Sequence, residues 1–140
     1  MVRRLNNQRG ATAVEFALVL PLLILFLFGI IEFGVLLYDM LWIKNAAREG
    51  ARVGIVYAKE RRTIEEIENE VKDYEKYLIT FGSSSSNIVF DPPIVPCINS
   101  GDELKVTVKY TYDFFVLSSF LPFIELPPIP LEETVIMRCE

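Results

Sequence analysis

Histidine is absent from this chain of 140 residues, and cysteine occurs only twice. Histidine is the commonest general base and the commonest metal ligand in proteins, so its absence argues against a catalytic or metal-binding centre. The chain has no C-x-x-C pair that could hold zinc, and no phosphate-binding, dinucleotide-binding or nucleophile-elbow glycine motif. We therefore expect a protein that is not an enzyme and that uses no cofactor, metal or small-molecule substrate.

Charge is missing from residues 16–31, and Glu32 is the only charged residue before the apolar run ends at Tyr38. A helix over residues 11–38 would be roughly 40 Å long at ~1.5 Å per residue, whereas a bilayer core is about 30 Å thick. Residues 18–31 show no polar stripe, which the core helix of a soluble protein would need. These features predict one transmembrane helix over residues 11–38.

The charges on either side of the apolar run predict its orientation. Arg3, Arg4 and Arg9 precede the run without an acidic residue, and basic residues remain on the cytoplasmic side of a membrane. Residues 39–140 should then lie outside the cytoplasmic membrane, where 17 acidic against 11 basic residues argue against a nucleic-acid partner. A cleaved secretory signal is the other interpretation, but the run is longer than a usual signal core and no small-x-small site closely follows it.

Small residues recur beyond the apolar run, in a stretch that has good helix formers and no proline. Ala46, Gly50 and Gly54 are spaced four residues apart and would share one face of a continuing helix. Such a face permits another backbone to approach closely. It could pack against the sheet of its own domain or against neighbouring copies of the chain, and the sequence leaves both open.

The outer part combines one amphipathic helix with short strands, which predicts a small α+β domain at the end of the long helix. Thr63 and Glu66 form a T-x-x-E capping box, and apolar residues follow at helical spacing from about Ile64 to Thr80. Residues 81–87 are rich in serine and indicate a loop.

Three segments of the remaining sequence have the pattern of strands. Residues 104–112 alternate apolar and polar side chains, residues 134–139 alternate near the end, and residues 87–90 form a shorter apolar segment. They predict a short antiparallel sheet of three strands, with a turn at residues 99–102. The phenylalanine- and proline-rich segment 114–130 could fold over the sheet edge, lie against the membrane or face a partner.

The two cysteines, Cys97 and Cys139, both lie in the outer part. An oxidising compartment permits a disulfide between them. Closing a loop of about 43 residues would stabilise the domain by ~4 kcal/mol in the chain-entropy description. Two unpaired buried thiols are the alternative.

A single carboxylate, Glu15, lies near the head of the apolar run, five residues after Gly10. A charged group in this environment is costly unless it is paired. Cleavage between Gly10 and Ala11 would create an α-amine at the head of the helix. Within one helix this amine points along the axis and is poorly placed for Glu15. A parallel neighbouring helix, staggered by about one turn, could present its own amine to Glu15 instead.

The leader that ends at Gly10, with Glu15 and Phe16 fifth and sixth after it, resembles a type IV prepilin-like leader. The longer pattern resembles the TadE/TadG-like pseudopilins of tight-adherence (Flp) pilus systems, and it consists of RGATAVEFALVLPLLILFLFGIIEFG, NAAREGARVG and VIMRCE. The resemblance implies that a prepilin peptidase removes residues 1–10 and that Glu15 supports processing or the registration of subunits. It also implies a minor subunit that helps to initiate or anchor the pilus, in contact with membrane lipid, other pilin subunits and the assembly machinery.

The main alternative is a single-pass anchor that displays a binding or sensing domain and keeps residues 1–10. Glu15 would then have no role in assembly. Glu32 matches a second carboxylate that is common in the GIIEFG segment of the family that this chain resembles. Glu32 could be an interfacial residue at the outer surface or could make a specific contact, and the sequence does not decide between these roles.

Overall fold

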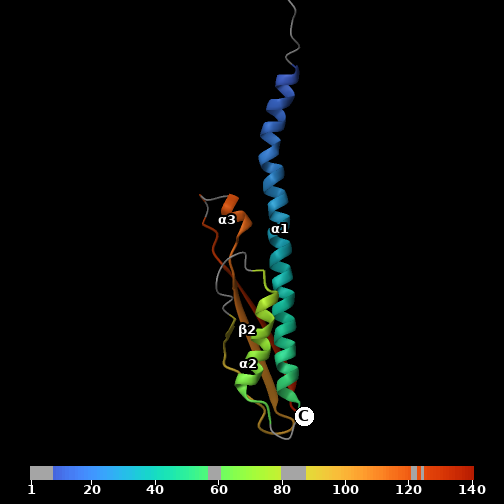
Figure 1. The fold of residues 1–140 in the computed structure, drawn as a ribbon, viewed down its shortest axis with the longest axis vertical. Helices are drawn as coiled ribbons and strands as arrows, with labels where there is room; N and C mark the ends of the chain where they lie inside the picture. Colours follow the sequence, from blue (N-terminus) through green and yellow to red (C-terminus); the bar gives the residue numbers. More distant parts are fainter. Residues whose placement is uncertain (1–7, 57–60, 80–87, 121–122, 124) are drawn as a thin grey trace, which may run out of the picture.

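The computed structural model describes residues 8–56, 61–79, 88–120, 123 and 125–140. Its largest element is α1 (Gln8–Ile55), a helix of 48 residues that would measure roughly 70 Å at ~1.5 Å per residue. Figure 1 shows that the first part of α1 stands alone and that a small folded domain lies along its second part. The predicted extension of the helix beyond the apolar run is confirmed, and the helix continues through Pro21.

The predicted capping box is present at the start of α2 (Ile64–Lys72). Glu66 donates its backbone N–H to the Thr63 hydroxyl at 3.3 Å, and Thr63 donates its N–H to the Glu66 carboxylate at 3.0 Å. Two backbone donors that a helix start leaves unpaired are thereby satisfied. α2 ends at Lys72, earlier than the predicted end near Thr80.

The 3-10 helix η1 (Asp73–Tyr77) takes the place of the last predicted turns of the amphipathic helix. Residues three apart lie above one another in such a helix. Tyr74 and Tyr77 thereby both reach Trp42 of α1, at ring-centroid distances of 6.0 and 4.5 Å. The serine-rich loop predicted at residues 81–87 lies outside the described part of the chain.

Three antiparallel strands form the sheet in the order β1-β2-β3, which confirms the predicted strand number and direction. β1 is Val89–Phe90, β2 is Glu103–Tyr112 and β3 is Ile129–Arg138. The turn before β2 includes Gly101 at φ +93°, a conformation that glycine adopts at little cost.

β3 begins earlier than predicted, inside the proline-rich segment 114–130. Pro130 belongs to β3 and lies opposite Thr111 of β2. Proline is tolerated in edge strands, and β3 is an edge strand because it pairs with β2 alone. The regular strand therefore includes the last residues of the segment 114–130.

The hydrophobic core lies between α1, α2 and one face of the sheet. α1 contributes mostly small side chains to it, such as Ala46, Ala47 and Ala51, and α2 contributes Ile67 and Val71. The side chains that β2 directs into the core alternate along the strand as predicted: Leu104, Val106, Val108, Tyr110 and Tyr112. Because small α1 residues face large sheet residues, the helix and the sheet approach closely over the second part of α1.

Candidate functional site

The predicted processing and assembly residues lie on the exposed first part of α1. Gly10, Ala11, Glu15 and Phe16 are all exposed, and Phe16 is 61% accessible. None of the described residues pairs with the Glu15 carboxylate within this single chain. Glu15 is therefore placed to meet another molecule, and its pairing with a neighbouring amine stays a prediction.

An apolar groove runs along α1 between Leu22 and Leu37. Gly29 and Gly34 contribute to it, and apart from their chain neighbours no described residue places a side chain within 4 Å of the position that a Cβ atom would take at either glycine. Leu117 lines the groove from outside α1. The part of α1 from Gly10 onward is long and apolar enough to cross a membrane.

Glu32 makes the most extensive polar contact among the described residues, although only 1% of its surface is accessible. Its Oε1 atom accepts hydrogen bonds from the Tyr112 hydroxyl at 2.7 Å and the Phe115 N–H at 3.0 Å. Its Oε2 atom accepts from the N–H groups of Val116 and Leu117 at 2.7 and 2.9 Å. Of the two roles left open for Glu32, the structure shows a specific contact within the chain.

The backbone donors to Glu32 belong to the start of the short helix α3 (Val116–Phe120). The first N–H groups of a helix have no partner within the helix, so the carboxylate supplies the missing acceptor. Ser118 and Ser119 turn their hydroxyls back to backbone carbonyls, including that of Phe115 at 3.0 and 2.8 Å. The first part of the segment 114–130 is thus fastened to α1.

Asp39, two turns after Glu32 on α1, is a second buried acid, with 0% of its surface accessible. Its Oδ1 atom accepts the N–H of Ile79 at 2.9 Å. Its Oδ2 atom is buried and has no hydrogen-bond partner among the described residues. Burial raises the pKa of the Asp39 carboxyl above its ordinary value, and the hydrogen bond from Ile79 opposes this only in part.

The small-residue face of α1 packs within its own domain. A Cβ atom on Gly54 would lie 2.5 Å from Leu104 Cδ2 and 2.8 Å from Ile67 Cδ1. A Cβ atom on Gly50 would collide with Val71 of α2, and Ala46 is completely buried. This face is therefore covered by α2 and β2 in the single chain, which is the first of the two arrangements that the sequence left open.

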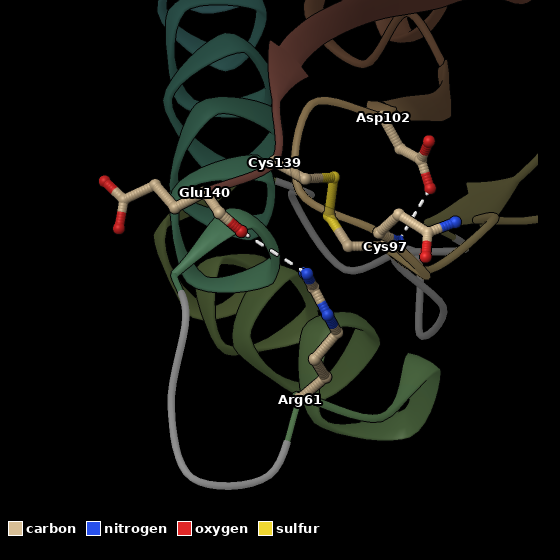
Figure 2. Close-up of a disulfide and its surroundings, with 6 residues drawn as sticks. Arg61, Cys97, Asp102, Cys139 and Glu140 are labelled. Atoms are coloured by element: carbon tan, nitrogen blue, oxygen red, sulfur yellow. Dashed lines mark hydrogen bonds between the residues drawn. A yellow bond between two sulfur atoms is a disulfide. The ribbon is translucent and has the colours of Figure 1, made fainter.

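A disulfide joins Cys97 to Cys139 at the far end of the domain (Figure 2). The Cys139 backbone makes two hydrogen bonds to the turn before β2. Its carbonyl accepts the Gly101 N–H at 2.8 Å, and its N–H donates to the Asp102 carbonyl at 2.8 Å. The bridge therefore joins the loop after β1 to the end of β3.

At the same end of the domain, the last residue of α1 is hydrogen-bonded to Glu140. Glu140 donates its N–H to the Ile55 carbonyl at 3.2 Å, and its own carbonyl accepts from Arg61 Nη2 at 3.3 Å (Figure 2). Ile55 is the last residue of α1, where helical carbonyls lack partners. Hydrogen bonds therefore join the domain to α1 near Glu32, at Asp39 and near Ile55.

Sequence reasoning missed the partners of Glu32 and the role of Asp39. The only local signal for either was the cost of a carboxylate in a mostly apolar helix. The donors to Glu32 lie 80 to 85 residues later in the chain, and the donor to Asp39 lies 40 residues later. No motif connects these positions.

Comparison with known proteins gives one family. The family described as TadE-like protein matches residues 10–52, so the resemblance found in the sequence is confirmed over that stretch. The match indicates a pilus-associated structural component, and it includes Glu15, Glu32 and Gly50. No curated protein matches the chain. No solved structure matches it either.

Proposed function

We propose that this chain is a minor pilin-like subunit of a tight-adherence pilus, anchored in the cytoplasmic membrane by the first part of α1. The observation that carries the proposal is the isolated Glu15 carboxylate on an exposed apolar helix, five residues after Gly10. The TadE-like match begins at Gly10, the residue before the proposed cut. A structural role also agrees with a sequence that has no histidine.

Processing creates the group that Glu15 needs. A prepilin peptidase cuts between Gly10 and Ala11 and leaves a positively charged amine on Ala11. Glu15 of one subunit then pairs with the amine of the next, because two parallel helices staggered by about one turn bring these groups together. Phe16 follows Glu15 and packs in the same contact region. Pairing removes the cost of an isolated carboxylate in the apolar phase.

The remaining parts of the chain have complementary tasks. Arg3, Arg4 and Arg9 hold the leader on the cytoplasmic side until cleavage. The apolar side chains that line the groove between Leu22 and Leu37 favour burial in the acyl-chain region of the membrane. The folded domain lies outside the membrane, where the disulfide between Cys97 and Cys139 is stable.

Intact-mass analysis of the chain extracted from membranes of a peptidase-competent host tests the proposal. We expect a mature species that begins at Ala11, and we expect Gly10→Val to retain residues 1–10 because a branched side chain hinders the cut. Ala13→Val, three residues further along the same exposed helix, is the matched control and should be cleaved normally. An unaltered chain that keeps residues 1–10 would instead support an unprocessed anchor for a binding or sensing domain.

A further inference from the structure

The hydrogen bonds at Glu32 fix the position of α3 along the axis of α1. Glu32 is the first charged residue after the uncharged run 16–31. A helix over residues 11–31 would be roughly 30 Å long at ~1.5 Å per residue, which matches a bilayer core of about 30 Å. The outer edge of the hydrocarbon would then lie beside Glu32, several residues before Tyr38. Since Glu32 binds the start of α3, α3 lies at this same level.

α3 also overlaps the membrane-spanning part of α1. Leu117 lines the same groove as Leu22, Phe26 and Ile30, all of which precede Glu32. Figure 1 shows α3 beside α1 at the end of the domain that is nearest to the isolated part of the helix. Leu117 therefore lies next to side chains that contact acyl chains when α1 spans a membrane.

The polar groups at the start of α3 are satisfied without water. Glu32 accepts the first N–H groups, and the hydroxyls of Ser118 and Ser119 donate to carbonyls within the same segment. An irregular segment at membrane depth is tolerated only when its backbone groups have partners in the protein. The start of α3 meets this requirement, because a buried carboxylate and two serines supply the partners.

Two large apolar side chains of this region are exposed. Phe115 is 45% accessible and Phe123 is 95% accessible. No lysine or arginine occurs in residues 110–137, whereas Asp113 and Glu125 are exposed acids. The region therefore lacks a cation for lipid phosphate groups, and any attraction to a membrane must come from burial of apolar surface.

We propose that α3 and Phe123 together form a foot that embeds in the outer leaflet of the lipid bilayer, with Glu32 as the residue that positions it. The partner is the acyl-chain region of the lipid, because the foot continues the lipid-facing surface of α1 past Glu32. This inference rests on the proposed membrane anchor. It sets the outer end of the span near Ile31 and orients the folded domain relative to the membrane surface.

Tryptophan fluorescence in vesicles tests the foot. The full chain is reconstituted in phosphatidylcholine vesicles whose acyl chains are either plain or brominated, since bromine quenches only nearby tryptophan. Trp42 is the single native tryptophan, and it lies ten residues beyond Glu32 against Tyr77. Phe123→Trp should add emission that brominated chains largely abolish, while the emission of Trp42 remains.

Two matched variants separate the foot from the anchor. Phe26→Trp reports on the span, because Phe26 is 70% accessible on α1. Ile98→Trp reports on the far end of the domain, where Ile98 is 73% accessible, and it should not be quenched. Loss of quenching for Phe26→Trp would overturn the anchor and the proposed function. Quenching of Phe26→Trp without quenching of Phe123→Trp would overturn the foot alone.

The role of Glu32 has its own test in the same vesicles. Glu32→Gln in the Phe123→Trp chain should lower the quenching, because the amide cannot accept all four hydrogen bonds. Quenching that is unchanged would show that Glu32 does not position the foot.

The same vesicles also test the partner of the foot. If brominated lipid leaves the added emission of Phe123→Trp intact, but this emission changes with the protein-to-lipid ratio, the partner is a second copy of the chain and the lipid assignment is overturned.

Discussion

The carboxylate of Glu32 accepts a 2.7 Å hydrogen bond from the hydroxyl of Tyr112, which lies 80 residues later in the chain. Glu32 belongs to α1 and Tyr112 ends the central strand β2, so this bond joins the helix to the sheet. Burial of Tyr112, and then its hydrogen bond to the Glu32 carboxylate, raise the pKa of its hydroxyl, which therefore remains a donor across the physiological pH range. One bond thus links α1, which is long and apolar enough to cross a membrane, to the core.

Replacing Glu32 tests how much this junction contributes to stability. Glu32→Gln keeps the shape of the side chain but replaces one carboxylate oxygen by an NH₂ group, which cannot accept a hydrogen bond. In either orientation of the amide, at least one part-buried backbone N–H loses its acceptor, at about 1–3 kcal/mol. We expect a clear fall in the free energy of unfolding, measured by chemical denaturation of the full chain in detergent.

Tyr112→Phe is the matched comparison for Glu32→Gln. It removes one donor and leaves the three backbone N–H groups bonded to Glu32. We expect a loss of about 1 kcal/mol, smaller than that of Glu32→Gln. Equal losses for the two variants would mean that the backbone donors contribute little, contrary to the geometry.

Local patterns predicted most of the fold because each is encoded by residues close together in the sequence. The capping box at Thr63 needs only Glu66, and the alternation that ends at Tyr112 is complete within one strand. The uncharged run 16–31 predicts an exposed apolar helix by itself. Elements that repeat a simple spacing are therefore accessible from a single sequence.

The contacts of Glu32 and Asp39 join segments that are far apart in the chain, so the sequence alone did not predict them. Glu32 meets Val116, and Asp39 meets Ile79, through backbone N–H groups that any residue type except proline could supply. Residue identity consequently carries no signal for either pair. The face containing Gly54 was recognised, but whether it meets the chain's own sheet or another copy depends on three-dimensional packing.

Because Gly54 packs closely against α2 and β2, we predict that a larger side chain at this position lowers the stability of the fold. Gly54→Ala would place a Cβ atom 2.5 Å from Leu104 Cδ2 and 2.8 Å from Ile67 Cδ1, both in fully buried side chains. Overpacking of this kind costs about 1–3 kcal/mol, and alanine regains about 1 kcal/mol through its higher helix propensity. We expect a net loss of stability in chemical denaturation.

Gly34→Ala is the control for helix propensity at Gly54. Apart from its chain neighbours and the adjoining backbone of α1, no described residue has an atom within 4 Å of the position of its Cβ, and Gly34 belongs to the same helix. We expect the stability of the isolated chain to stay constant or to rise by up to about 1 kcal/mol. A gain at Gly54 as large as that at Gly34 would show that Leu104 and Ile67 move aside at no cost.

Burial of Asp39 predicts a pH dependence of stability. Burial raises the pKa of the Asp39 carboxyl in the folded state. Between the ordinary aspartate pKa and this raised pKa, the folded state therefore keeps a proton that the unfolded state has released. The free energy of unfolding should fall as pH rises from the ordinary aspartate pKa through the raised one, and the deficit should remain at neutral pH. Asp39→Asn cannot ionise, so it should abolish this fall.

Fluorescence of Trp42 is a suitable measurement for Asp39→Asn, because its stacking partner Tyr77 lies two residues before Ile79, the donor to Asp39. Thermal unfolding of the full chain in detergent at several pH values should show a flatter profile for Asp39→Asn. Glu125→Gln alters an exposed acid and should leave the profile unchanged. A fall of equal size in Asp39→Asn and the unaltered chain would assign the pH dependence to another group.

Because the Glu15 carboxylate is exposed, we predict that replacing it impairs assembly and leaves membrane insertion intact. Glu15→Leu should insert in the membrane at least as well as the unaltered chain, since it removes a charge from the apolar run. Its incorporation into pili should fall by about tenfold or more, because losing ~1.4 kcal/mol of pairing energy already reduces association tenfold. Ala13→Leu adds the same side chain at a nearby exposed position and should assemble normally. The measurement compares membrane and sheared-pilus fractions, and normal incorporation of Glu15→Leu would refute pairing between Glu15 and a neighbouring amine.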